Sequence, residues 1–410
     1  MASDGWPAAY ARLAAAVPGA AAAARLTLCG MNACVDARVE LHAAEALFAA
    51  GDPGAAALAA LLVERVRRGI GGEVRLEWPE GPAWLAANLA LDRSLGGTGP
   101  QAAWVLSALG APALLALEDR SPEMLAALPP GILLYEGSEI VRSPHVASRG
   151  RSRGNVYIFD FVAGQAVAGV LPPRSSRVIV RLSDPGLEHD EAFDNCSPAL
   201  AGEAGAGLVA GFNAVPPDLL DAEIRRMRAL CLAWRESGLD LVHLELAGYD
   251  TDDALHAVLG AMSGAVSSLG MSQSELERIA PPGSGLADAM LAIAARLGVR
   301  RLCVHADEWA ATVTTGDPEA EREALMMGSL LAAARAEVGR PVARIAVPRA
   351  AQFQEPPFGA EVPVPQGWRF VACAAPYLDR PASTLGLGDT FTAGCLLVLG
   401  QQRGARRLIA

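Results

Sequence analysis

A short segment near the carboxyl end combines a glycine-rich turn with an acidic residue. Residues 383–390 read Ser-Thr-Leu-Gly-Leu-Gly-Asp-Thr and precede an apolar run. A turn of this kind that opens a helix directs several backbone N–H groups to one place, where the helix dipole adds partial positive charge. A transferring phosphoryl group suits that place, and Asp389 could take a proton from the attacking hydroxyl. An aspartate that merely caps a helix gives the same pattern, so this motif alone leaves both interpretations open.

Two further pairs of residues have spacings that could do chemistry. His243 and Glu245 stand two apart at the end of an apolar run, so both side chains point to one face of the expected strand. Ligands bind at strand ends in open α/β sheets, although an isolated pair of this type is more often a buried histidine satisfied by a carboxylate. Ser272 and Glu275 form the pattern of a capping box in front of an apolar helix.

The composition excludes several kinds of chemistry. The 410-residue chain contains no lysine, so all 34 basic residues other than histidine are arginines. A Walker-A lysine, a protein-kinase strand lysine and a Schiff base are therefore excluded. Any phosphate that the protein binds through a cationic side chain must be bound by arginine.

The charge and the cysteines limit the partners and the compartment. A net charge of −11 disfavours nucleic acid, and no apolar stretch of about 18 residues could span a bilayer. The seven cysteines are scattered without a C-x-x-C pair, which argues against a zinc ribbon and against a disulfide framework. We therefore expect a cytoplasmic protein that binds small molecules, without nucleic acid or membrane partners.

The elements that must position these residues follow from hydrophobic periodicity. The pattern predicts a helix over 6–17, a buried strand over 25–31, a helix within 39–68, and a meander of strands over 155–161, 166–170 and 177–182. From about residue 218 onward helices and strands alternate, which is typical of a mostly parallel sheet covered by helices on both faces. We therefore predict a large α/β domain of residues 1–36, 96–150 and 186–410. A smaller lid domain, residues 37–95 and 151–185, should cover it.

In the order of its motifs the chain resembles the ADP-dependent glucokinase and phosphofructokinase family, a branch of the ribokinase-like sugar kinases. The resemblance runs from about Leu26 to the carboxyl end. Its landmarks are residues 30–36 (GMNACVD), 96–97 (GG), 177–179 (RVI), 243–245 (HLE), 269–276 (LGMSQSEL) and 386–390 (GLGDT). The resemblance implies a ribokinase-like fold, in which a discontinuous α/β lid covers a three-layer α/β/α domain.

The resemblance also implies roles for single residues. Glu245 and Glu275 would arrange Mg²⁺, Glu245 through water, although Ser272 stands where the family usually has asparagine. The catalytic turn would comprise Gly386, Leu387, Gly388 and Asp389. The nucleotide would contact His305, Val347, Thr384 and Gly388, with packing as the alternative role of His305. The substrate would contact Asn32, Asp36, Glu73, Gly96, Gly97 and Arg177.

The residues that depart from the family pattern bear on the substrate. Glu73 stands where the glucokinase branch tends to have a sugar-binding glutamate, and Ala166 stands where the phosphofructokinase branch uses a lysine. Both favour a neutral sugar over a sugar phosphate. Arg177 should face a phosphate, unless it is a surface salt-bridge arginine.

The sequence therefore predicts an ADP-dependent, Mg²⁺-assisted kinase of a glucose-like sugar, acting as a monomer or a small homo-oligomer. Three alternatives stay open: an ADP-dependent phosphofructokinase, an ATP-dependent ribokinase-like kinase of a nucleoside or another alcohol, and a family member that binds its ligand without catalysis.

Overall fold

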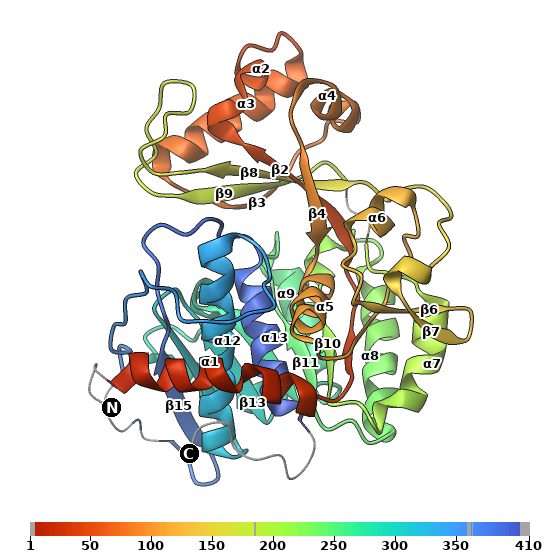
Figure 1. Ribbon diagram of the computed structural model, residues 1–410, viewed down its shortest axis with the longest axis vertical. Coiled ribbons are helices and arrows are strands. Elements are labelled where there is room, and N and C mark those ends of the chain that lie inside the picture. The colour runs from red at the N-terminus through yellow and green to blue at the C-terminus, as the bar shows by residue number, and fades with distance from the viewer. Residues whose placement is uncertain (1–4, 184–185, 359–361, 363, 402–410) are drawn as a thin grey trace.

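Two separate sheets organise the computed structural model, which describes residues 5–183, 186–358, 362 and 364–401 (Figure 1). The larger sheet has ten strands in the order β15-β14-β13-β12-β11-β10-β1-β5-β6-β7, and the smaller has five in the order β3-β9-β8-β2-β4. The strands of the larger sheet are β1 (Thr27–Cys29), β5 (Ala113–Leu115), β6 (Leu133–Glu136), β7 (Glu139–Arg142), β10 (Ala206–Val209), β11 (Val242–Glu245), β12 (Ser268–Ser272), β13 (Arg301–His305), β14 (Trp309–Thr314) and β15 (Arg369–Ala374).

The centre of the larger sheet is parallel, from β13 through β12, β11, β10, β1 and β5 to β6, and antiparallel strands flank it at both edges. Its central strands are short and buried on both faces, as parallel sheets require, and they are mostly apolar except for His243 and Glu245 in β11. Successive side chains enter different cores: Leu28 packs into one cluster and Cys29 into the other. The predicted α/β fold with helices on both faces is therefore confirmed.

Each face of the larger sheet has its own set of helices. One face is covered by α7 (Glu191–Ala201), α8 (Leu220–Glu236), α9 (Asp252–Met262), α10 (Gln273–Ile279) and α11 (Leu286–Leu297). The other is covered by α1 (Gly5–Ala23), α5 (Thr98–Leu109), α6 (Pro122–Ala127), α12 (Pro318–Val338) and α13 (Leu387–Leu399). The helix expected over 6–17 is thus present and longer.

The smaller sheet lies beyond one end of the larger one (Figure 1). Its strands are β2 (Cys34–Glu40), β3 (Gly72–Arg75), β4 (Asp92–Gly96), β8 (Asn155–Phe161) and β9 (Ser176–Arg181). They pack through a separate apolar cluster against α2 (Glu45–Phe48), α3 (Pro53–Arg68) and α4 (Gly81–Asn88). Because β2 is continuous from Cys34 to Glu40, the expected boundary between residues 36 and 37 falls inside one strand.

Two expectations for this region are wrong. The helical pattern over 39–68 contains the end of β2, a 3-10 turn and α2 before α3 begins, because Asp52 caps α3 through the Ala55 N–H at 2.9 Å and Pro53 opens its first turn. Residues 166–170 form a tight turn closed by Val167 and Val170 instead of a strand, with Ala168 at φ 46°. Short apolar runs do not distinguish a turn from a strand.

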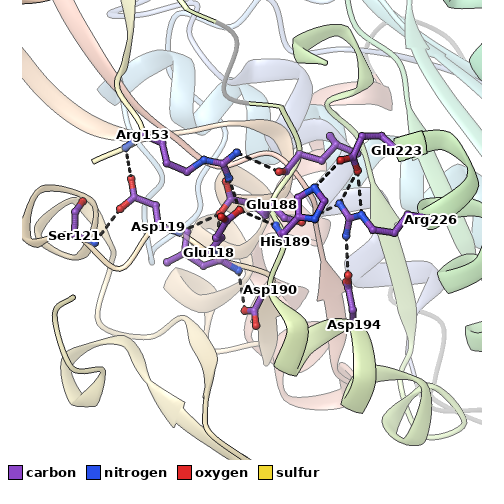
Figure 2. Close-up of polar contacts among 12 residues, drawn as sticks. Glu118, Asp119, Ser121, Arg153, Glu188, His189, Asp190, Asp194, Glu223 and Arg226 are labelled. Carbon is purple, nitrogen blue, oxygen red and sulfur yellow. Dashed lines mark hydrogen bonds and ion pairs between the residues drawn. The ribbon is translucent and has the colours of Figure 1, made fainter. Parts of the chain in front are cut away.

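A network of buried charges joins the segments that pass between the sheets (Figure 2). Glu188, which follows β9, is fully buried and accepts from the Glu118 N–H at 2.5 Å and from Arg153 Nη1 at 2.7 Å. Its own N–H donates to the Met31 carbonyl at 2.6 Å. Burial raises the pKa of Glu188 to about 7, and the Arg153 charge opposes that rise. Segments before β2, before β8 and after β9 are thereby held together.

The same network continues outward through a second arginine (Figure 2). Arg226 on α8 donates to Asp194 Oδ2 at 2.7 Å, to Glu223 Oε2 and to the Glu188 carbonyl. His189 Nε2 lies 2.5 Å from Glu223 Oε1. Helices α7 and α8 are therefore tied to the junction between the sheets.

The crossing of α12 and α13 is unusually close because glycines face each other. A Cβ atom on Gly394 would lie 2.7 Å from the Gly328 Cα, and one on Gly328 would lie 2.6 Å from the Phe391 carbonyl oxygen. Both neighbours are backbone atoms, which cannot move aside cheaply. This contact sets the position of the amino end of α13 relative to α12.

We expect Gly394→Ala to lower the free energy of unfolding by about 1–3 kcal/mol, because the added methyl group overpacks the crossing. Gly260→Ala is the matched control: it lies exposed in α9 with no atom within 4 Å of the added Cβ. It should stabilise by about 0.5–1 kcal/mol through helix propensity. Urea unfolding of both variants checks this, and equal effects would contradict it.

Candidate active site

The glycine-rich turn forms the start of α13, as the sequence predicts. Gly386 is in the left-handed region at φ 68° and immediately precedes the helix. The Thr390 N–H donates to the Gly386 carbonyl at 3.0 Å, and the Thr390 hydroxyl donates to the same oxygen at 2.7 Å. Leu387 and Gly388 line the cavity described below. The amino end of α13, whose first N–H groups have no partner within the helix, therefore borders that cavity.

Asp389 lies in the first turn of α13, among charges from other elements. Burial raises the pKa of its carboxyl group. The Arg335 guanidinium opposes that rise most strongly, followed by the Thr98 hydroxyl, while Glu245 adds to it. A carboxylate with a raised pKa is a stronger proton acceptor than an exposed aspartate, and this suits a general base.

A cavity of about 690 Å³ opens beside this turn. Its lining brings together Thr384, Leu387 and Gly388 of the turn, Arg177 of β9 and His305 of β13. The expected nucleotide contact Val347 is not in the lining; it is half-buried and packs against the core beneath α1, α12 and α13. The segment around Tyr377 lines the cavity instead.

Arg177 reaches the turn from the smaller sheet. Its Nη1 donates to the Thr384 Oγ1 at 2.7 Å, and its Nε is buried without a hydrogen-bond partner. Among the described residues no carboxylate oxygen lies within 4 Å of it, so the alternative of a surface salt bridge is not what is observed. Burial lowers the pKa of Arg177, and Asp160, Asp389 and Asp36 oppose this from further away. A buried cation without a carboxylate partner suits a bound anion.

Glu245 at the end of β11 is enclosed by donors. His243 Nε2 lies 2.8 Å from its Oε2, the Thr392 hydroxyl donates to the same oxygen at 3.0 Å, and His305 Nε2 lies 3.4 Å from Oε1. Burial by itself would raise the pKa of Glu245, but the two histidines bring it down to about 2. Gly270 is required here because its Cβ would lie 2.1 Å from Glu245 Oε2.

Glu275 forms the expected capping box. Its Oε2 accepts from the Ser272 N–H at 2.7 Å, and its own N–H donates to the Ser272 hydroxyl at 3.4 Å. Burial raises the pKa of Glu275, and Glu245 adds to the rise, so the two carboxylates interact across the same space. Both interpretations of Glu275, helix cap and ion organiser, are compatible with this position.

The carboxylates at this place suit Mg²⁺ only through bridging water molecules. Oxygen ligands are those that Mg²⁺ prefers, and the ion usually keeps several waters. Both oxygens of Glu245 already accept contacts, and within the described ranges no group of three or more His, Cys, Asp or Glu side chains could hold a metal directly. The residues present therefore fit an ion held through water by Glu245 and Glu275.

Four of the expected sugar contacts gather where β2 begins and β4 ends. Asp36 is buried and accepts a contact from the Cys34 thiol at 3.6 Å. A Cβ on Gly96 would lie 2.2 Å from Asp36 Oδ1, and one on Gly97 would lie 2.0 Å from the Asn32 carbonyl oxygen. The Asn32 Oδ1 is buried without a partner. The two glycines therefore leave the space that Asp36 and Asn32 occupy.

Glu73 is part of a contact between the two sheets. Its Oε1 accepts from Arg181 Nε on the neighbouring strand β9, and its Oε2 accepts from Asn213 Nδ2 at 3.4 Å. Nearby, Arg75 donates to Asp250 and to the Asn213 carbonyl. Glu73 is therefore not a solvated surface carboxylate, because both of its oxygens accept hydrogen bonds.

The residues that sequence reasoning missed are Thr98, Gln101 and Arg335. Arg335 lies buried in α12, and its guanidinium is so close to the turn that a Cβ on Gly386 would come within 2.4 Å of it. Arg335 Nη1 donates to Gln101 Oε1 at 2.7 Å and to the Thr390 hydroxyl at 3.0 Å. Nothing in its local sequence distinguishes this arginine from a surface residue of an alanine-rich helix.

We expect Asp36→Asn to change how stability depends on pH. Burial raises the pKa of Asp36 to about 7 from 3.8, so between these values the folded state holds a proton that the unfolded chain has lost. In this window the carboxyl group ionises only in the unfolded chain. The free energy of unfolding of the wild type therefore falls as pH rises, by up to about 1.4 kcal/mol per pH unit. Urea unfolding measures the free energy of unfolding of both proteins at pH 4 and pH 8. The variant should become more stable relative to the wild type at pH 8 than at pH 4, and an equal difference at both pH values would contradict this.

The comparisons with known proteins agree with this geometry. The conserved region of the ADP-specific phosphofructokinase/glucokinase family matches residues 26–398. A structure described as an ADP-dependent kinase complex with fructose-6-phosphate and ADPbetaS superposes with a TM-score of 0.77 at 17% identity, covering 98% of this chain and 100% of that one. A structure described as the last common ancestor of ADP-dependent phosphofructokinases from Methanosarcinales superposes with a TM-score of 0.72 at 17% identity, covering 98% of this chain and 100% of that one.

A phosphofructokinase from Pyrococcus horikoshii, solved with AMP, gives a TM-score of 0.68 at 18% identity over 92% of this chain and 97% of that one. At these identities the likeness concerns the fold. No curated protein sequence matches closely enough to add to it. Over the described residues no helix combines the length and apolar character that a bilayer crossing requires. The match over residues 26–398 shows that the chain belongs to the ADP-specific phosphofructokinase/glucokinase family.

Proposed function

We propose that the protein transfers the terminal phosphoryl group of ADP to a hydroxyl group of a neutral, glucose-like sugar. One observation carries this proposal. The first turn of α13 and the guanidinium of Arg177 line one cavity, Asp389 belongs to that turn, and the buried carboxylate of Asp36 is close enough to influence Asp389 electrostatically. An anion-binding helix end beside a buried carboxylate suits in-line phosphoryl transfer.

Each side chain then has a definite task. Asp36 and Asn32 accept and donate hydrogen bonds to sugar hydroxyls, so that the reacting oxygen faces Asp389. Asp389 takes the proton of that hydroxyl as the oxygen attacks phosphorus, and the leaving AMP departs from the opposite side. The backbone N–H groups of residues 386–389, together with Arg177, stabilise the charge on the migrating phosphoryl group.

The nucleotide occupies the 690 Å³ cavity, with Thr384 and Gly388 at its phosphates and His305 close to the turn. A Cβ on Gly388 would come within 3.1 Å of His305 Cε1, so the histidine also fixes the spacing of the turn. Glu245 and Glu275 would hold Mg²⁺ through water, and the ion would supply positive charge that neutralises the transferring phosphate.

The preference for a neutral sugar rests on Glu73. Its ion pair with Arg181 neutralises the cation that would otherwise be available to a sugar phosphate at this end of the cleft. Ala166 provides no charge where the phosphofructokinase branch has lysine. The second candidate substrate is fructose 6-phosphate, which is bound in one of the structures of similar fold.

The smaller sheet acts as a lid in this proposal, comprising residues 37–95 and 151–185 together with the start of β2. It carries Asp36, Glu73 and Arg177, so the site is complete only when the two sheets approach. Closure excludes water that would otherwise hydrolyse the nucleotide. We place the enzyme in the cytoplasm, because all seven cysteines are free and most are buried. We expect it to act as a monomer or a small homo-oligomer.

The decisive test is Asp389→Asn. Without a base the turnover number should fall by about 10²- to 10⁴-fold, while the affinity for ADP stays close to that of the wild type. Product formation by coupled assay and ADP binding by calorimetry measure the two quantities. Glu139→Gln, which changes an exposed carboxylate on the edge strand β7 outside the cavity lining, is the matched control and should retain activity. Near-normal turnover of Asp389→Asn would refute the assignment.

The substrate is tested by a panel. We expect turnover with ADP to exceed that with ATP, and glucose-like sugars to exceed fructose 6-phosphate. Glu73→Ala should weaken sugar binding and release Arg181, which should improve relative activity on the sugar phosphate. A wild-type preference for fructose 6-phosphate would favour the second candidate. Tight binding of ADP without product from any sugar would indicate a member that binds without catalysis.

A further inference from the structure

Arg335 is a buried cation directly behind the phosphate-binding turn. Only 3% of the residue is exposed, and it projects from α12 toward the turn at Gly386. The atoms that a Cβ on Gly386 would meet, at 2.4–2.6 Å, are the two terminal nitrogens and the central carbon of the guanidinium. Glycine at position 386 is therefore needed both for its left-handed backbone and for the space that the arginine fills.

The hydrogen bonds of Arg335 do not neutralise it. Nη1 donates to the Gln101 amide oxygen and to the Thr390 hydroxyl, and Nε is buried without a partner. Within the described part of the chain no carboxylate oxygen lies within 4 Å of its nitrogens. The nearest influences are the Asp389 and Asp36 charges, while Arg177 repels it. Burying a cation without a partner is costly, and the carboxylates of Asp389 and Asp36 act on Arg335 only from a distance.

The contacts of Arg335 also connect the turn to the smaller sheet. Gln101 Nε2 donates to the Leu95 carbonyl on β4, and its Oε1 accepts from Arg335. Arg335 then donates to Thr390, whose hydroxyl donates to the Gly386 carbonyl at 2.7 Å. A continuous chain of hydrogen bonds therefore runs from a strand of the smaller sheet to the turn itself.

We propose that Arg335 is a positioning residue of the phosphoryl-transfer site: it holds the turn of residues 386–390 in its anion-binding shape and supplies fixed positive charge behind it. This inference rests on the proposed function, because it concerns the same turn. The charge acts on the terminal phosphate of ADP through the turn and need not touch it. In a chain without lysine, the buried guanidinium provides the positive charge from within the fold.

The same charge acts on Asp389. The groups that influence this carboxylate are Arg335 from α12, Arg177 from β9, Thr98 from α5, Glu245 from β11 and Asp36 from β2. Arg335 is the strongest of those that oppose the effect of burial on its pKa. Removing the arginine should therefore raise the pKa of Asp389 and shift the acidic limb of the kcat profile to higher pH.

The test compares ADP with AMP, which lacks the terminal phosphate, in binding to wild type, Arg335→Met and Arg335→Lys. Met keeps much of the apolar stem and removes the charge, and Lys restores a charge without the planar fork. We expect the ratio of ADP to AMP affinity to fall about tenfold or more in Arg335→Met. Arg335→Lys should recover part of the loss. The kcat profile of Arg335→Met should rise at a higher pH than that of the wild type.

Arg120→Met is the matched control, because Arg120 is equally buried but is paired with Asp190 and does not line the cavity. It should be destabilised without a change in the ADP to AMP ratio. A folded Arg335→Met with an unchanged ratio and pH profile overturns the proposal. If Arg335→Met does not fold, the test rests on Arg335→Lys. An Arg335→Lys protein with the wild-type ratio of ADP to AMP affinity and an unshifted kcat profile would show that a charge alone suffices. That result would overturn the role of the planar guanidinium group in holding the turn.

The binding measurement separates this inference from the proposed function. If the wild type forms no product with any sugar, the proposed function fails, but the ADP to AMP ratio still tests the charge behind the turn. If Asp389→Asn loses turnover while Arg335→Met keeps both the ratio and the profile, the proposed function stands and the inference about Arg335 fails.

Discussion

Mutual attraction between buried charges around the first turn of α13 is the interaction on which the rest of the site depends. Asp389, Asp36, Arg177 and Arg335 come from four different elements, and each influences the protonation of others. Each charge alone would be costly to remove from water. Together they offset part of that cost, and a phosphate and a Mg²⁺ ion would complete the compensation. A binding site for an anion is therefore built into the charge balance of the fold.

This balance explains why the site spans two sheets. Asp36 and Arg177 belong to the smaller sheet, whereas Asp389 and Arg335 belong to helices packed on the larger one. Movement of one sheet away from the other would separate Asp389 from Arg177 and Asp36 from Arg335, and would admit water. The buried network around Glu188 joins three of the connecting segments, so the approach of the sheets is guided at that junction (Figure 2).

Close backbone approach is the second constraint. Gly270 gives room to Glu245 and His243, Gly386 to Arg335, and the facing pair Gly328 and Gly394 brings α13 against α12. An added methyl group at any of them would displace a side chain or a helix that the site needs, so stability and function are limited by the same contacts.

The sequence by itself determined those features whose physics is local. The turn of residues 386–390 and the capping box of Ser272 and Glu275 were readable because each depends on residues within four positions of one another. The shared face of His243 and Glu245 followed from the two-residue period of a strand. Tertiary structure alone decided that Val347 packs in the core, that residues 166–170 form a turn, and that β2 extends past residue 36. It also decided that Arg335 lies behind the turn, because 51 residues separate it from Gly386 and only the crossing of α12 with α13 brings them together.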